Sequence, residues 1–291
     1  MNAMKKTYFL AAVTILIWST SATVSKLLLG ALDSMQVLCV SALFASAFWL
    51  LANAVTGNMQ KLKAYTWKDY LLTAGIGMTG IFLYYLLLYT GTDMMPVSQA
   101  LIINYLWPIM SVVFACILLK EKMTARKAIA IALSFLGVVI VVGQGLSQFQ
   151  TSTLIGAGCC VLAAVSYGVF TALNQKYTYD KRISMMIFSL VTFLLSGLFL
   201  AVTGSIPKLN LLQTAGMAYN GIFNLAIATT TWALALESGK TAKVSNLAYI
   251  TPFLSLVWAA VFLKEQVRLS SVLGLVVIVL GILVQLKDRE S

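Results

Sequence analysis

Apolar residues fill long runs of about 20 residues, and short polar connections separate these runs along the whole chain. A helix rises 1.5 Å per residue, so about 20 apolar residues cross the ~30 Å hydrocarbon layer of a membrane. The connections, such as residues 57–68 and 177–182, hold the charged and turn-forming residues. The pattern predicts an all-α integral membrane protein with ten transmembrane helices, near residues 7–29, 35–56, 69–91, 96–119, 127–145, 153–175, 183–203, 211–236, 241–263 and 269–286.

The pattern also repeats after 144 residues. Residues 103–122 read INYLWPIMSVVFACILLKEK, and residues 247–266 read LAYITPFLSLVWAAVFLKEQ. The same offset places Gly77 on Gly221. Both copies carry a proline near the start of the run and end on Leu-Lys-Glu. The chain therefore contains an internal duplication.

The predicted helices divide evenly between the copies, so we expect repeats at residues 1–147 and 148–291. Each repeat holds five helices. Because five is odd, the second repeat must cross the membrane in the opposite direction to the first. Inverted repeats of this kind are typical of transporters, which bind a substrate between the repeats and expose it alternately to each side.

Composition supports a lipid environment. The 291 residues are 60% hydrophobic and 10% charged, with a mean hydropathy of +0.91, whereas a soluble domain carries about 25% charged residues. The net charge of +11 comes from Lys and Arg residues in the connections, which favours anionic lipid over nucleic acid as the partner.

The distribution of these cations predicts the orientation. With the N-terminus inside, 16 of the 20 Lys and Arg residues fall in cytoplasmic segments, and four are outside: Lys26, Lys208, Lys264 and Arg268. This bias predicts cytoplasmic N- and C-termini in a cell (inner) membrane. We expect the chain to function as a monomer.

Enzyme chemistry is poorly supplied. All nine Asp and Glu residues lie at the ends of predicted helices or in connections, and the chain has no His. The cysteines, Cys39, Cys116, Cys159 and Cys160, lie in apolar runs without zinc-site spacing. We therefore expect no enzymatic activity, no metal and no cofactor. Proton exchange at a mid-membrane carboxylate is also unsupported, so facilitated movement and proton antiport both stay open.

Uncharged polar and aromatic residues are the candidates for substrate binding. Pro108 interrupts the fourth predicted helix and frees a backbone carbonyl near Asn104. Asn104 and Trp107 share a helical face, and Tyr105 joins them only if the helix is distorted. Interfacial anchoring of Tyr105 and Trp107, with a proline kink that serves packing alone, is the alternative interpretation.

Other candidates follow from helical spacing or from the duplication. The full predicted set is Trp18, Tyr84, Asn104, Tyr105, Trp107, Tyr167, Asn174, Asn220, Asn224, Trp232 and Tyr249, with helix breaks at Pro108 and Pro252. Tyr84 and Tyr85 are adjacent, so we expect only one of them to face inward. Glu121 and Glu265 close the repeated Leu-Lys-Glu ends, where they could pair with neighbouring cations.

The two proline-to-LKE segments, the opening ILIWSTSATVSK and the predicted ten-helix length resemble the EamA branch of the drug/metabolite transporter superfamily. INYLWP and SYGVFTALNQKY are similar to the aromatic amino-acid exporters of that branch. The resemblance implies outward transport of aromatic or hydrophobic amino acids. Aromatic rings that stack on a substrate ring, with Asn or backbone groups for a zwitterion, fit that substrate.

Two other functions stay open. A carrier of phosphorylated or nucleotide-linked sugars needs cations in its cavity, and only Lys26 and Lys176, at helix ends, are placed for this role. A non-transporting membrane assembly subunit has no need of a duplicated polar interior, so the repeated polar patches favour a transporter of small neutral or zwitterionic metabolites.

Overall fold

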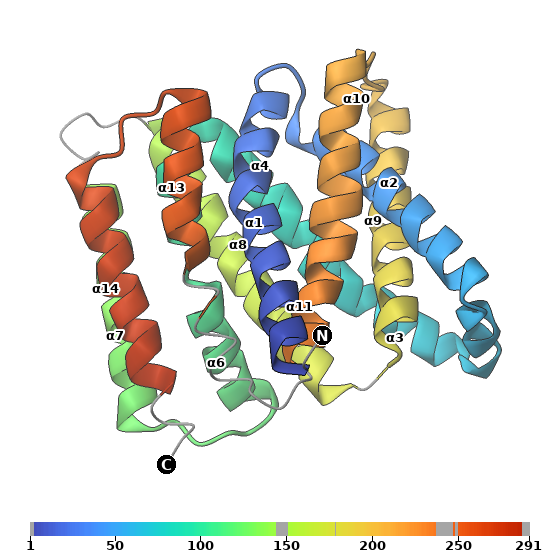
Figure 1. The fold of residues 1–291 in the computed structure, drawn as a ribbon, viewed down its shortest axis with the longest axis horizontal. Helices are drawn as coiled ribbons and strands as arrows, with labels where there is room; N and C mark the ends of the chain where they lie inside the picture. Colours follow the sequence, from blue (N-terminus) through green and yellow to red (C-terminus); the bar gives the residue numbers. More distant parts are fainter. Residues whose placement is uncertain (1–2, 144–150, 178, 237–246, 248–249, 287–291) are drawn as a thin grey trace. The chain divides into compact units, whose positions relative to one another are not determined.

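The structure is a computed structural model that describes residues 3–143, 151–177, 179–236, 247 and 250–286. These residues form helices joined by short connections (Figure 1). Within the described residues, six helical stretches are long and apolar enough to cross a membrane: Thr7–Leu29, Ser34–Val55, Trp67–Met94, Val97–Leu118, Thr151–Lys176 and Lys181–Thr203. Shorter apolar helices cover Ile250–Leu263 and Leu269–Val284.

The chain packs as two compact units. Unit 1 comprises residues 1–86 and 178–251, and unit 2 comprises residues 87–177 and 252–291. Each unit combines helices from both halves of the sequence, because the closest helix partners, such as α2 with α9 and α7 with α14, come from opposite halves. Each compact unit therefore includes residues from both of the predicted repeats, 1–147 and 148–291.

Unit 1 contains α-helices and three tighter or wider helical segments. Its elements are α1 (Ala3–Leu29), α2 (Ser34–Val55), the 3₁₀-helix η1 (Asn58–Ala64), α3 (Trp67–Gly77), the π-helix η2 (Met78–Leu83), α9 (Lys181–Thr203), α10 (Leu211–Ala218), the π-helix η4 (Tyr219–Ala228) and α11 (Thr229–Leu236). α2 packs along α9 and η4, and α1 packs along η4 and α11.

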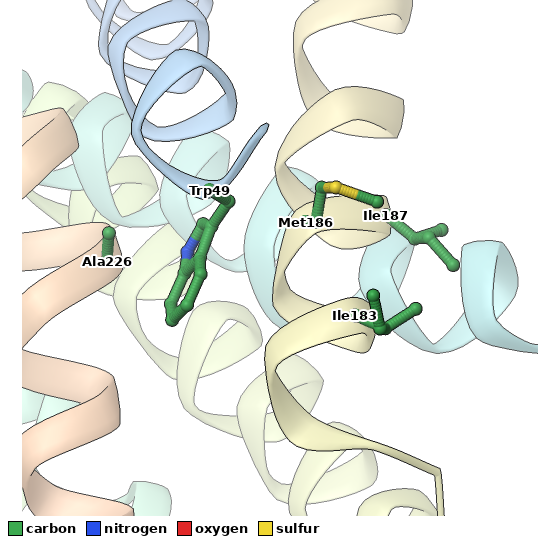
Figure 2. Packing of buried hydrophobic residues seen from close by; sticks show 5 residues of the cluster. All are labelled: Trp49, Ile183, Met186, Ile187 and Ala226. Atoms are coloured by element: carbon green, nitrogen blue, oxygen red, sulfur yellow. The ribbon is translucent and has the colours of Figure 1, made fainter. Parts of the chain in front are cut away.

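The core of unit 1 forms where α2, α9 and η4 meet. Trp49 of α2, Ala226 of η4 and the α9 residues Ile183, Met186 and Ile187 form one buried hydrophobic cluster, and Figure 2 shows Trp49 between Ala226 and α9. Asp180 begins α9, because its carboxylate accepts hydrogen bonds from the backbone N–H groups of Arg182 and Ile183. The apolar face of α9 is thereby held against α2 from its first turn.

Unit 2 contains most of α4 (Tyr84–Met94) together with α5 (Val97–Asn104), α6 (Trp107–Leu118), α7 (Ala125–Gly143), α8 (Thr151–Lys176), α13 (Ile250–Leu263) and α14 (Leu269–Leu286). α7 and α14 lie side by side along their length (Figure 1). α8 packs against α6 and α5. The fourth apolar run is thus two helices, α5 and α6, with Tyr105 and Leu106 in a turn between them.

Close helix contacts at glycines occur as reciprocal pairs in unit 2. A Cβ added at Gly137 would lie 2.7 Å from the carbonyl oxygen of Gly274, and one added at Gly281 would lie 2.8 Å from that of Ala130. The 144-residue offset converts Ala130 into Gly274 and Gly137 into Gly281. α7 and α14 therefore contact each other through equivalent backbone positions.

Unit 1 contains a second reciprocal pair. A Cβ at Gly77 would lie 2.9 Å from the Cα of Phe188, and one at Gly221 would lie 2.7 Å from the Cβ of Phe44. The same offset relates Gly77 to Gly221 and Phe44 to Phe188. Gly77, at the end of α3, therefore lets this helix approach α9 closely, and Gly221 lets η4 approach α2 in the same way.

The adjacent tyrosines behave differently from the sequence-based expectation. Tyr84 and Tyr85 are both buried, with 9% and 8% of their surfaces exposed, so the expectation that only one faces inward is wrong. Their rings meet edge to face, with centroids 4.8 Å apart. The π-helix η2 ends immediately before Tyr84 and shifts the helical register there. The expectation assumed a regular α-helix and so did not take this shift into account.

Candidate functional site

An aromatic pair links α1 and α11 in unit 1. The rings of Trp18 and Trp232 lie 5.4 Å apart between centroids at an interplanar angle of 52°. Trp18 is half-buried, so its ring is only partly used in packing. The two residues are 214 positions apart in the sequence, and the packing of α1 along α11 brings them together.

Hydrogen bonds join α1 to η4 and α11 on both sides of this pair. The hydroxyl oxygens of Thr14 and Thr231 lie 2.7 Å apart, and those of Thr20 and Tyr219 lie 2.6 Å apart. Thr14 lies four positions before Trp18, on the same helical face. Sequence reasoning did not include Thr14 and Tyr219, although this spacing is a signal that could have identified Thr14.

The two asparagines of η4 are buried. Asn220 has no exposed surface, and its side-chain amide donates to the hydroxyl of Ser25 at 3.0 Å. Asn224 is 4% exposed. Both lie on a π-helix, a helix type in which backbone hydrogen bonds skip one extra residue and which often marks functional sites. Because buried amides are costly, these residues are placed for specific hydrogen bonding.

A second aromatic cluster lies in unit 2. The rings of Trp107 and Tyr167 meet edge to face, 5.2 Å apart at 80°, and Phe170 lies 5.4 Å from Tyr167. Gly168 allows this contact between α6 and α8, because a Cβ there would lie 2.7 Å from the carbonyl carbon of Met110. Two predicted site residues, Trp107 and Tyr167, are therefore in direct contact.

The helix interruption between α5 and α6 supports this cluster. α5 ends at Asn104, and α6 begins at Trp107 with Pro108 in its first turn. A proline fits there because the backbone N–H groups of the first turn have no partner within the helix, so the N–H that proline lacks is not needed. Asn104 and Tyr105 are 5% and 7% exposed, so the interruption places both residues in the protein interior.

The remaining candidates are more dispersed. Asn174 is exposed, and its amide donates to the carbonyl of Phe170 in its own helix at 3.1 Å. Pro252 is buried in the first turn of α13. Tyr249 lies outside the described residues. In the part of the chain that the structure describes, no group of His, Cys, Asp or Glu side chains could hold a metal ion.

The repeated Leu-Lys-Glu ends form the same turn. Lys120 and Lys264 both adopt left-handed backbone conformations, with φ of 58° and 54°. Such a φ is uncommon for a residue with a side chain. The backbone N–H of Glu265 donates a hydrogen bond to the carbonyl oxygen of Ala259 at 3.3 Å, as at a helix C-cap. The turn therefore fixes where each glutamate points.

The two glutamates then take different partners. Glu121 pairs with Lys127, with Nζ and Oε2 3.0 Å apart. Glu265 instead accepts hydrogen bonds from the backbone N–H groups of Val97 and Ser98, at 2.8 and 3.1 Å. A carboxylate at the N-terminus of α5 neutralises its unpaired donors and complements the helix dipole. The expected cation partner is present for Glu121, and Glu265 caps a helix.

The long apolar helices and the repeated sequence segments define a multi-pass, helical membrane protein with internal duplication. The chain belongs to the EamA-like transporter family, which it matches over residues 5–143 and again over residues 154–286. It is therefore a membrane transporter and not an enzyme.

Individual relatives agree with this assignment. An uncharacterized transporter of Clostridium kluyveri is 26% identical, with 99% of this chain and 95% of the relative covered. The uncharacterized transporter YvbV of Bacillus subtilis is 24% identical over 98% and 93% of the two chains. The uncharacterized inner membrane transporter YhbE of Escherichia coli K12 is 23% identical over 94% and 88%.

A protein of known crystal structure has the same fold. It is 21% identical to this chain, the match covers 96% of each chain, and the TM-score is 0.68. At this identity the similarity shows the fold alone.

Proposed function

We propose that the protein exports small neutral or zwitterionic metabolites, above all aromatic or hydrophobic amino acids, by alternating access. The observation that carries this proposal is the pairing of large rings beside uncharged hydrogen-bonding groups: Trp18 with Trp232, and Trp107 with Tyr167. An aromatic substrate gains apolar contact and ring stacking from such surfaces. The absence of Asp, Glu and His from the predicted helix interiors favours a solute without net charge.

The proposed architecture is ten transmembrane helices in two inverted five-helix repeats, residues 1–147 and 148–291. Two observations support it. The family match occurs twice, once in each half, and the glycine contacts are reciprocal under the 144-residue offset. In this architecture both termini are cytoplasmic, and the carrier functions as a monomer in the cell inner membrane.

Substrate class is tested by transport. The purified chain is reconstituted into liposomes, and uptake is measured for radiolabelled amino acids, phosphorylated sugars and cationic dyes. We expect saturable transport of aromatic or hydrophobic amino acids. Saturable transport of phosphorylated sugars alone contradicts the proposed substrate and supports the sugar carrier.

The role of the ring pair is tested by substitution at Trp107. Trp107→Ala removes the edge-to-face contact with Tyr167 and a stacking surface worth on the order of ~1 kcal/mol, so affinity for aromatic substrates falls about fivefold or more. Trp107→Phe retains most of the affinity. Affinity is measured by scintillation proximity, and folding is checked by size-exclusion chromatography on the same preparation.

A matched control distinguishes binding from anchoring. Trp67 is 72% exposed at the start of α3, so Trp67→Ala removes a tryptophan of equal size outside the cluster. We expect it to leave substrate affinity unchanged. Unchanged affinity in folded Trp107→Ala would show that Trp107 anchors α6 and does not bind substrate.

A further inference from the structure

A basic surface lies where two distant segments of unit 1 meet. Residues 61–70 contain η1's last turn and the first turn of α3, and residues 179–182 lead into α9. Lys61 Nζ lies 2.6 Å from Asp180 Oδ2. The ring of Tyr65 lies between those of Tyr70 and Tyr179, at centroid distances of 5.5 and 5.6 Å. The basic surface is therefore assembled by the tertiary structure.

The charge of this surface is strongly positive. It carries five basic residues and two acidic ones, for a net charge of +3: Lys61, Lys63, Lys68, Lys181 and Arg182 against Asp69 and Asp180. The basic residues are all exposed. Both carboxylates are held by the protein, because Asp180 begins α9 and Asp69 accepts from Thr66 and from the hydroxyl of Tyr179.

An exposed apolar face lies directly beside these cations. Trp67, Tyr70 and Leu71 are 72%, 36% and 52% exposed. Their spacing of i, i+3 and i+4 places them on one face of α3. α3 begins the apolar stretch Trp67–Met94, so this face lies at the end of a candidate membrane span. Tryptophan and tyrosine next to cations are typical of the boundary between hydrocarbon and head groups.

We propose that the basic surface binds the head groups of anionic phospholipids. The cations of residues 61–68 and 181–182 meet the lipid phosphates, and the face formed by Trp67, Tyr70 and Leu71 contacts the glycerol and upper acyl region. A soluble anion satisfies the cations but offers nothing to the apolar face. The charge and the position of that face therefore identify a membrane lipid as the occupant. This binding is independent of the transported substrate.

Fluorescence of Trp67 reports the contact directly. The full chain is reconstituted in dioleoylphosphatidylcholine vesicles that contain increasing fractions of brominated phosphatidylglycerol or, in parallel, brominated phosphatidylcholine. The Trp67 signal is the difference between the protein and Trp67→Phe. We expect half-maximal quenching at a several-fold lower fraction of phosphatidylglycerol than of phosphatidylcholine. Raising the salt from ~0.01 M to ~1 M shortens the Debye length from ~30 Å to ~3 Å and should remove the preference.

Charge-matched variants locate the effect. Lys63→Gln with Lys68→Gln removes two charges from the basic surface, and we expect this to abolish the several-fold lipid preference, because each Lys or Arg near an anionic surface contributes about 1 kcal/mol. Lys208→Gln with Arg268→Gln removes two charges from other connections and should retain it.

Three results overturn the proposal: equal quenching by the two lipids, an equal loss in both double variants, or reversal of quenching by ~10 mM soluble glycerol phosphate. If the Lys63 and Lys68 variant does not fold, the salt titration decides, because a salt-independent preference is incompatible with charge recognition.

Discussion

The contact between α7 and α14 makes a strong prediction about Gly137. A Cβ added there would lie 2.5 Å from Ile278 Cγ1 and 2.7 Å from the carbonyl oxygen of Gly274, where ordinary contacts are 3.4–4 Å. Neither helix has space to accept the methyl group without moving. Gly137→Ala should therefore weaken the packing of unit 2, although the substitution is the smallest possible.

The expected magnitude combines two opposing effects. Replacing glycine by alanine inside a helix favours the folded state by about 0.5–1 kcal/mol. Overpacking a close contact costs about 1–3 kcal/mol. Gly158 supplies the matched control, because it lies within α8 of the same unit and a Cβ there meets nothing within 4 Å. The helix preference is shared by both variants, so their difference isolates the overpacking cost of about 1–3 kcal/mol.

Thermal unfolding of the purified chain in one detergent measures this difference. For a chain of this size, 1 kcal/mol corresponds to about 2–4 °C in the unfolding temperature. Gly137→Ala should unfold several degrees below Gly158→Ala. Gly281→Ala should match Gly137→Ala, since its Cβ would lie 2.8 Å from the carbonyl oxygen of Ala130. If Gly137→Ala is as stable as Gly158→Ala, α7 and α14 are not packed at backbone contact and the reciprocal arrangement is wrong.

Three further predictions concern orientation, charge and pH. A reporter active only in the periplasm should be silent when fused after Ser291, and activity there would contradict both an even number of spans and the inverted repeat. Neutralising single carboxylates at helix ends should leave equilibrium substrate binding largely intact, which calorimetry checks on the Gln or Asn variants of Asp93, Glu121 and Glu265; complete loss of binding in one of them would reveal an overlooked charged site. Partial burial raises the pKa of Asp180, but the hydrogen bond and charge of Lys61 and the N–H groups of α9 outweigh it and lower the pKa below its usual value. The stabilisation from Asp180 should therefore be present above about pH 4 and be lost as the pH falls through the folded pKa; the unfolding temperature of Asp180→Asn should depend less on pH in this range, and an unchanged pH dependence would contradict the ion pair.

The sequence was sufficient for the class of protein and for most of the helices. Long apolar runs identify helices because each run alone must satisfy its backbone hydrogen bonds within lipid. The predicted run at residues 211–236 corresponds to α10, η4 and α11 together, and the run at 96–119 corresponds to α5 and α6. The duplication and the family were likewise visible in the residues themselves, and the family match confirms the EamA assignment.

Sequence alone was less informative about irregular helices. The π-helices η2 and η4 interrupt two predicted helices without a proline, and no composition signal marks them. An inserted residue changes which side chains share a face, and so Tyr84 and Tyr85 are both buried against the α-helical expectation. Pro108 is the contrary case, because a missing N–H is a local property and the interruption could be predicted.

The pairing of side chains was decided by the tertiary structure. Sequence spacing nominated Trp18, Trp232, Trp107 and Tyr167 one helix at a time, and only the packing of α1 along α11 and of α6 along α8 selects the two ring pairs. Glu265 is a second example. The repeated Leu-Lys-Glu sequence marks the turn at the end of α13, but the partner of Glu265, the N-terminus of α5, depends on which helix packs beside that turn. Periodicity reports how one helix divides between lipid and protein, whereas a contact depends on two surfaces at once, so partners are chosen by the helices that meet in space.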